Sequence, residues 1–425
     1  MLLDYRPNWS RDVEVSISFK TEILSSRDGT EQRRALRANP RKQVSFTAMK
    51  YGADRQQQIF GTADAQRQEI SLADPTRSVT CSAVADDDIT LDSIPDWLVV
   101  GESVVLDRTV EVTVLSVVGS IVTVSDSVAL PEPFDVRPAL RGMLQSEISL
   151  SSRTSRLWEV PIQFDLTPGS ELSYNYDADL FRHAGRQVWH ADPNWGSNNS
   201  FGINQKRETI DFGHGATSHL FPVPYADRLQ TWDFSPLRSG AVGYIEGLFN
   251  HCRGRAGEFM LPTFHEDATP LADLVAGDAD ILVEGTHLLG METDWVHRYL
   301  LIALNDGRIW YRTVVDSVED AGNTLLSVNR NFVETVAPDQ VKHISLMSVA
   351  RFASDELVSQ WTTDDVASVR VNFLSLPVTV SEEDGMTLDP SAEFMLEFFG
   401  RENPAGHSDI VDILLNINWA DTFDE

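Results

Sequence analysis

The chain has 425 residues, a length at which two or three domains are more common than one. Hydrophobic residues make up 42% and charged residues 23%, which is a globular composition and excludes a disordered or fibrous chain. The 34 basic residues against 64 acidic ones give a formal net charge of −30, which excludes the broad basic face that binds nucleic acid or anionic membranes.

The predicted elements are mostly strands, because apolar and polar residues alternate over short stretches, as they do where a strand has one buried face. In chain order, the first part holds a strand at 13–20, a weak helix at 49–60, a hairpin at 110–117 and 121–124, and a strand at 158–166. The second part holds a helix at 240–252, a hairpin at 309–315 and 324–328, and a strand at 368–376. The helix is predicted from five apolar residues at i, i+3, i+4 spacing, with Gly254 as its stop: Val242, Ile245, Leu248, Phe249 and Cys252.

The two parts align with one another. Three landmarks recur at a separation of 186 residues: Trp9 and Trp195, Glu22 and Glu208, Gly29 and Gly215. Later landmarks are further apart: Glu69 and Glu258 by 189, Ser116 and Ser317 by 201, Met143 and Met347 by 204, Pro168 and Pro377 by 209. Growing separations indicate insertions in loops of the second copy, where added length costs little free energy. Chance similarity between two β-rich segments is the alternative.

We therefore expect a mainly β protein made of two duplicated β-sandwich-like lobes, at residues 1–168 and 180–377. Each lobe is expected to contain a short helix and an inserted small β-barrel or hairpin module. The modules are predicted at about 95–135 and 280–335. An acidic C-terminal tail, residues 378–425, lies outside the duplication.

The tail holds 12 acidic residues and a single basic one, Arg401, together with apolar clusters that include Phe394, Phe398 and Phe399. Two interpretations stay open. The tail is either a solvated, partly disordered end, or a segment that docks on a partner, because exposed phenylalanine clusters are costly unless something covers them.

No signature of a catalytic, cofactor or metal site stands out, and we expect neither an enzyme nor a bound cofactor. His251 and Cys252 are adjacent, so on a helix their side chains point about 100° apart and do not face each other. The two cysteines, Cys81 and Cys252, have no CxxC partners, which argues against a zinc site. No apolar run reaches the roughly 20 residues that span a bilayer, and no signal peptide is recognised, so membrane insertion is not expected.

A basic stretch interrupts the acidic chain at Arg33, Arg34, Arg37 and Arg41. A nucleic-acid patch is one interpretation. We favour arginines that pair with acidic surfaces, such as those of a neighbouring copy, because the guanidinium group suits ion pairs at interfaces. These arginines and the three tail phenylalanines are the predicted assembly contacts.

Trp9, the stretch EILSSRDGTEQRRALR at residues 22–37 and Pro40-Arg41 follow one another within the first 45 residues. In this order they resemble the opening of minor tail proteins of long-tailed bacteriophages. The stretch RGRAGEFMLP at residues 253–262 is similar to a later part of the same proteins. The second copy lacks the EQRxxLR element and keeps only Arg228-Leu229, so equivalent surroundings for the two copies are not expected.

The resemblance implies a structural virion protein of the distal tail or baseplate, made in the host cytoplasm, whose β-sandwich cores form a ring around a channel. The expected partners are further copies of the chain (a hexamer, or a trimer with pseudo-six-fold symmetry), the tail tube protein, the baseplate hub and other tail-tip proteins. DNA only passes through. Repeated head-to-tail contacts either close into a ring or continue as a filament, and an acidic lumen lets DNA slide without adhering.

Two other functions are kept as alternatives. A carbohydrate-binding adhesin on the tail tip would use a platform formed by Tyr174, Trp189 and Trp195, although Trp and Tyr on strands are more often core or interface groups. A depolymerase would use paired carboxylates as acid and base. With so many acidic residues, no particular pair is indicated.

Overall fold

The structure, a computed structural model, describes residues 2–3, 5–26, 31–51, 61–95, 97–154, 156–168, 181–215, 217–223, 226–293 and 298–377. Strands make up 54% of the described residues, which confirms the predicted mainly β class. The predicted acidic tail at 378–425, with Phe394, Phe398 and Phe399, lies outside the described residues.

The first half of the chain is a succession of strands with one helical turn at residues 61–65. The strands are β1 (Leu2–Leu3), β2 (Val13–Ser18), β3 (Thr21–Ser25), β4 (Glu31–Ala35), β5 (Arg41–Tyr51), β6 (Ile70–Ala73), β7 (Val79–Ala85), β8 (Asp88–Leu91), β9 (Ser103–Leu106), β10 (Val110–Val118), β11 (Ile121–Val124), β12 (Phe134–Leu144), β13 (Ser151–Thr154) and β14 (Leu157–Leu166).

The second half begins with β15 (Arg182–His183) and β16 (Arg186–Val188) and contains the helix α2 (Ser239–Cys252) and three short 3-10 turns, η1 (Gly254–Ala256), η2 (Met291–Thr293) and η3 (Pro338–Gln340). Its remaining strands are β17 (Ser200–Asn204), β18 (Glu208–Asp211), β19 (Thr217–Leu220), β20 (Asp227–Arg238), β21 (Phe259–Pro262), β22 (Asp280–Val283), β23 (Tyr299–Leu304), β24 (Ile309–Asp320), β25 (Asn323–Val328), β26 (Val341–Phe352), β27 (Glu356–Trp361) and β28 (Val366–Ser375).

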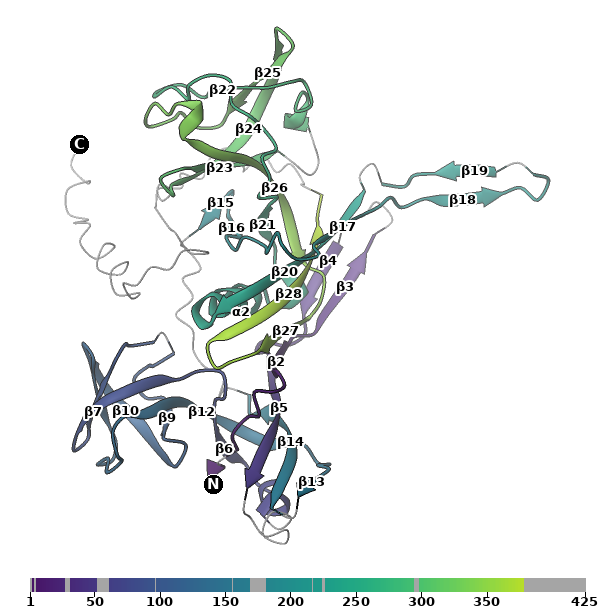
Figure 1. Cartoon of the computed structure of the whole chain (residues 1–425). Coiled ribbons are helices and arrows are strands. Elements are labelled where there is room, and N and C mark those ends of the chain that lie inside the picture. Colours follow the sequence, from purple (N-terminus) through teal and green to yellow (C-terminus); the bar gives the residue numbers. More distant parts are fainter. Residues whose placement is uncertain are drawn as a thin grey trace.

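Eight strands, four from each half, form one continuous antiparallel sheet through the middle of the molecule (Figure 1). The order of strands across this main sheet is β17–β20–β28–β27–β2–β5–β14–β13. The two halves meet at β27 and β2, in the centre. The strands β17 and β13 are therefore the two ends of the main sheet.

One face of the main sheet is apolar and the other polar, as alternating strands require. In β2, for example, Val13, Val15 and Ile17 are buried and the residues between them are not. The helix α2 packs on the apolar side, and a single core joins the two halves. The helix ends at Cys252, and the capping residue Arg253 has a left-handed backbone (φ 53°) and donates its N–H to the carbonyl of Asn250.

The same pairing order occurs in both halves. The order β2–β5–β14–β12–β6 in the first half recurs as β17–β20–β28–β26–β21 in the second. The registers of the strand pairs also match. In the first half, Val44 pairs with Phe164. In the second half, Gln230, which lies 186 positions after Val44, pairs with Phe373, which lies 209 positions after Phe164.

The Pro-Asn-Trp segments occupy corresponding places. The Asn8 N–H donates to the carbonyl of Thr47 at 2.7 Å, and the Asn194 N–H donates to the carbonyl of Asp233 at 2.8 Å. The side-chain oxygen of each asparagine accepts the N–H two residues on.

Two of the predicted alignments differ from the pairing pattern of the strands, because they rested on single identities. Met143 corresponds to Arg351, and Ser116 to Asp316.

Each half also carries a β module with a core of its own. The first module is built from β7 to β11 and the start of β12, and the second from residues 268 to 344. Both begin earlier than the predicted limits of 95 and 280. The reason in the first half is that β7 pairs with β12 and closes the module, with Cys81 opposite Phe134.

The predicted strands, both predicted hairpins and the helix at 240–252 are confirmed. The weak helix predicted at 49–60 is wrong for Met49 to Tyr51, which continue β5 because Tyr51 pairs with Leu157 of β14. Residues 52–60 lie outside the described residues.

Candidate assembly surfaces

The two halves of the main sheet are joined by the pairing of β2 with β27, which forms the seam between them. Six residues of β2 lie opposite six residues of β27, from Val13 opposite Trp361 to Ser18 opposite Glu356. Val13 and Trp361 are fully buried at one end of the seam. The pairing therefore carries both backbone hydrogen bonds and apolar contact from one half to the other.

Asp355, just before β27, fixes the β3–β4 hairpin to the second half. Its carboxylate accepts the Thr21 N–H at 2.7 Å, the Thr21 hydroxyl at 2.8 Å and the Arg255 N–H at 3.0 Å. Burial alone would raise the pKa of Asp355, but these hydrogen bonds hold the pKa below its usual value. Gly254 has φ +68° and lies so close that a Cβ there would be 2.7 Å from the Asp355 carboxylate, so only glycine fits.

Two ion-paired groups extend this contact. Arg33, a predicted assembly residue, pairs with Glu258 of the second half, which also accepts the Arg186 Nε–H at 3.0 Å. Burial alone would raise the pKa of Glu258, but Arg33 and Arg186 hold it below its usual value. Arg351 donates to both oxygens of Glu31, at 2.9 and 3.0 Å, which is the geometry in which arginine recognises a carboxylate best.

A buried charge cluster lies between the halves. Lys42 of β5 is 3.7 Å from the Glu246 carboxylate on α2, and Arg77 is 3.3 Å from the same oxygen and 3.4 Å from Asp74. All four side chains are at most 5% exposed, and their charges cancel. Burial lowers the pKa of Lys42, and the nearby Glu246 opposes that shift. Such a neutral cluster defines how the halves fit together, because any displacement leaves a buried charge unpaired.

The other predicted assembly residues are more exposed. Arg34 on β4 and Arg41 at the start of β5 are exposed, and Arg37 is half-buried. The residues that hold the halves together were missed from the sequence, apart from Arg33. A signal existed for two of them: Lys42 has the inward phase of an alternating strand, and Glu246 lies four residues after the buried Val242.

The ends of the main sheet are exposed. All the described side chains of β13 and β17 are exposed, and each strand pairs, within the part of the chain that the structure describes, with a single neighbour in the main sheet. Beyond β17, the β18–β19 hairpin projects from the body as an arm (Figure 1). The arm and β17 thus form a surface that no other described segment covers.

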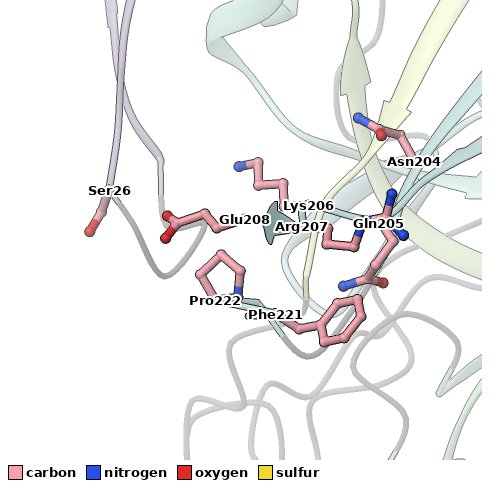
Figure 2. A pocket seen from close by; sticks show the side chains of 8 residues that line it. All are labelled: Ser26, Asn204, Gln205, Lys206, Arg207, Glu208, Phe221 and Pro222. Atoms are coloured by element: carbon pink, nitrogen blue, oxygen red, sulfur yellow. The ribbon is translucent and has the colours of Figure 1, made fainter. Parts of the chain in front are cut away.

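A hollow of about 630 Å³ lies between the base of the arm and Ser26, the residue after β3 (Figure 2). It is lined by Ser26, Asn204, Gln205, Lys206, Arg207, Glu208, Phe221 and Pro222. Seven of these residues are exposed and Pro222 is half-buried, so no buried polar group is held ready for a small ligand. The hollow is the space between two hairpins of matching position, and not a built pocket.

The proposed sugar platform is not assembled as predicted. Trp189 is fully buried, and its indole N–H donates to the carbonyl of Ala191 at 2.7 Å. It belongs to the core and cannot present a face to a sugar. Trp195 is 50% exposed, with its ring centre 4.6 Å from that of His265. Tyr174 lies outside the described residues.

Two histidines near the Pro-Asn-Trp segment of the second half, His183 and His190, and the predicted core thiol Cys252 are packed groups. His183 is hydrogen-bonded to the Thr313 hydroxyl at 2.9 Å, and the Nε2 atom of His190 is hydrogen-bonded to the Tyr311 hydroxyl at 2.7 Å. Burial lowers the pKa of His190 to about 3, so this imidazole is neutral at pH 7. Burial also raises the pKa of Cys252 to about 12, which keeps the thiol protonated.

The described residues contain no group of three or more His, Cys, Asp or Glu side chains placed to hold a metal ion. Among the helices of the same part of the chain, none has the length and apolar character needed to cross a membrane.

We predict that Asp355→Ala lowers the free energy of unfolding at pH 7 by about 1.5–3 kcal/mol, because hydrogen bonds to a charged group are lost. The folded-state pKa of Asp355 lies below its unfolded value, so its contribution is present above roughly pH 4 and disappears as the pH falls through the folded pKa. Urea denaturation at pH 7 and pH 3 measures this. The neighbouring exposed Glu356→Ala is the control, and an equal loss at both pH values for Asp355→Ala contradicts the prediction.

The chain was also compared with known proteins. No protein-family model matches it, and a search of curated proteins gives no match.

Proposed function

We propose that the protein is a structural component of a bacteriophage tail, built from two copies of one β unit that arose by tandem duplication. It forms a closed ring at the distal end of the tail, joins the tail tube to the hub and lets DNA pass. The ring consists of six chains, or of three chains whose six units give pseudo-six-fold symmetry. The acidic tail at 378–425 docks on a neighbouring tail protein.

The observation that carries this proposal is the main sheet itself. Its two four-stranded units, β2–β5–β14–β13 and β17–β20–β28–β27, have the same pairing order and are joined side by side in the same sense. Units that are joined in one sense either close or continue without limit. A wide channel follows from a closed sheet of many strands, since barrels of 16 or more strands already leave an open lumen.

The charges of the main sheet fit a channel wall. On its polar face, acidic side chains outnumber basic ones: Glu14, Glu159, Asp165, Asp227, Asp233 and Glu356 against Arg41, Arg153, Arg238 and Arg370. If this face lines the ring, it repels the phosphate backbone, so DNA slides without adhering.

Electron microscopy tests this proposal at two levels. Purified protein is expected to form closed rings with a central hole, and gold-labelled antibodies against the chain are expected to bind the tail tip of intact virions. A protein that stays monomeric at high concentration, or a label found elsewhere on the particle, contradicts the proposal.

A second candidate function is a carbohydrate-binding adhesin, because the half-exposed Trp195 beside His265 leaves part of an aromatic ring open to a sugar. Glycan binding that is lost in Trp195→Ala, with assembly intact, supports this function. Unchanged binding in that variant, or no binding by the parent chain, removes it.

A further inference from the structure

The internal seam has a counterpart at the ends of the main sheet. By their pairing, β17 corresponds to β2 and β13 to β27. Inside the chain, β2 and β27 are bonded to each other. Their counterparts β17 and β13 cannot meet within the chain, because they are the opposite ends of the sheet. A strand edge with free N–H and C=O groups is a template for another chain.

The register of the expected contact follows from the internal one. Glu14 lies opposite Gln360 in the seam. The residue in β17 that corresponds to Glu14 is Ser200, and the residue in β13 that corresponds to Gln360 is Ser151. A contact between two copies in this register places Phe201 opposite Leu150 and Ile203 opposite Ile148.

The side chains of β17 are those of a strand that lacks its partner. Val15 and Ile17 of β2 are 3% and 2% exposed, whereas their counterparts Phe201 and Ile203 are 56% and 67% exposed. Two large apolar side chains on an uncovered edge are costly in water. Their phase on the strand is the one that enters the core when the partner strand is present.

The stretch before β13 also lacks a partner strand among the described residues. In the second half, Glu356 to Val358 pair with β2 and with no residue of β28, so that part of β27 is a strand because β2 is there. The corresponding residues 147–149 are not in a strand. Ile148 in this stretch and Leu150 directly after it are half-buried against the core and offer an apolar strip at the free edge.

The arm completes the correspondence. The β18–β19 hairpin matches β3–β4 in register, with Thr209 opposite His219 where Ile23 lies opposite Arg33. The β3–β4 hairpin lies against the second half, whereas the described residues offer no corresponding surface to the arm. Its exposed apolar side chains are Ile210, Phe212, Leu220 and Phe221, and on the receiving side Met143, at the place of Arg351, is 46% exposed.

We propose that β17 and the β18–β19 arm of one chain dock on β13 and residues 147–150 of a second copy, in the register of the β2–β27 seam. The occupant of each free edge is therefore another copy of this chain. This inference gives the proposed ring its contact surface and rests on that function only for the closure of the ring, because the edge correspondence stands without it.

Disulfide trapping tests the register. Directly opposite residues in antiparallel strands have Cα atoms about 4.5–5.5 Å apart, which a disulfide can bridge. We expect Ser151→Cys/Ser200→Cys to link chains under mild oxidation, giving bands at multiples of 47.4 kDa in non-reducing electrophoresis. The control Ser149→Cys/Ser200→Cys is two residues out of register and is expected to stay unlinked. Both native cysteines are buried. Links in the control but not in the matched pair overturn the register.

A second variant tests the surface itself. Phe201→Asp/Ile203→Asp is expected to abolish self-association by light scattering and to leave the circular dichroism spectrum of the folded chain unchanged, because both side chains are exposed in the single chain. Val118→Asp, an equally exposed apolar site on β10, is the control and is expected to assemble normally. Rings that persist in the double variant overturn this contact but leave the ring function standing. Assembly through this edge without a place in the virion tail refutes the proposed function alone.

Discussion

Replacing Glu246 with glutamine is expected to lower the free energy of unfolding by about 3–5 kcal/mol, the range for a buried ion pair that loses one partner. The carboxylate of Glu246 balances Lys42 and Arg77, and all three side chains are at most 5% exposed. Without it, the cluster keeps two cations against the single carboxylate of Asp74. The measurement is chemical denaturation at pH 7 followed by circular dichroism.

A double variant identifies the cause of that loss. In Lys42→Met/Glu246→Gln the remaining charges, Arg77 and Asp74, balance again, so the double variant is expected to be more stable than Glu246→Gln alone. Glu266→Gln, at an exposed position, is the control and is expected to change stability by less than about 0.5 kcal/mol. A double variant that loses the sum of both single losses shows that packing, and not charge balance, is responsible.

The second large effect is expected at Trp189. Trp189→Ala should cost about 3–5 kcal/mol, because the indole is fully buried and packs against three phenylalanine rings with centres 4.9–5.9 Å away: Phe373, Phe234 and Phe259. The matched variant Trp195→Ala removes the same side chain from a half-exposed place and is expected to cost about 1 kcal/mol or less. Thermal unfolding of both variants measures the difference, and similar losses contradict the assignment of Trp189 to the core.

Local patterns were sufficient to predict much of the fold. Alternation over residues 13–20 specified a strand with one buried face, and the i, i+3, i+4 spacing of apolar residues specified α2. The separation of 186 residues between the Pro-Asn-Trp segments predicted positions that the strand registers also match. These features depend on neighbours in sequence, and therefore one sequence contains them.

The contact between the halves could not be predicted in the same way. Val15 and Ser359 meet across the seam although 344 residues separate them, and no local pattern records which edge of a strand finds which partner. Asp355 is one of 64 acidic residues, and its partner Thr21 is 334 residues away. Arg33 was singled out by its type, but no sequence pattern indicated Glu258, 225 residues away on the same chain, as its partner.

The long strands β12 and β26 run from the main sheet into the two modules, and each module has its own core. The separation between corresponding residues rises from 189 at β6 and β21 to 208 at β12 and β26, so these added residues lie in the second module. Within the corresponding strands of the main sheet the separation changes by a single residue, from 186 to 187, at the bulge of β20 between Phe234 and Leu237. The extra length of the second half thus lies at the periphery of the molecule, and the pairing order of the main sheet is the same in both halves. The tip of the β10–β11 hairpin is accordingly a suitable position for grafting an epitope or a fluorescent domain.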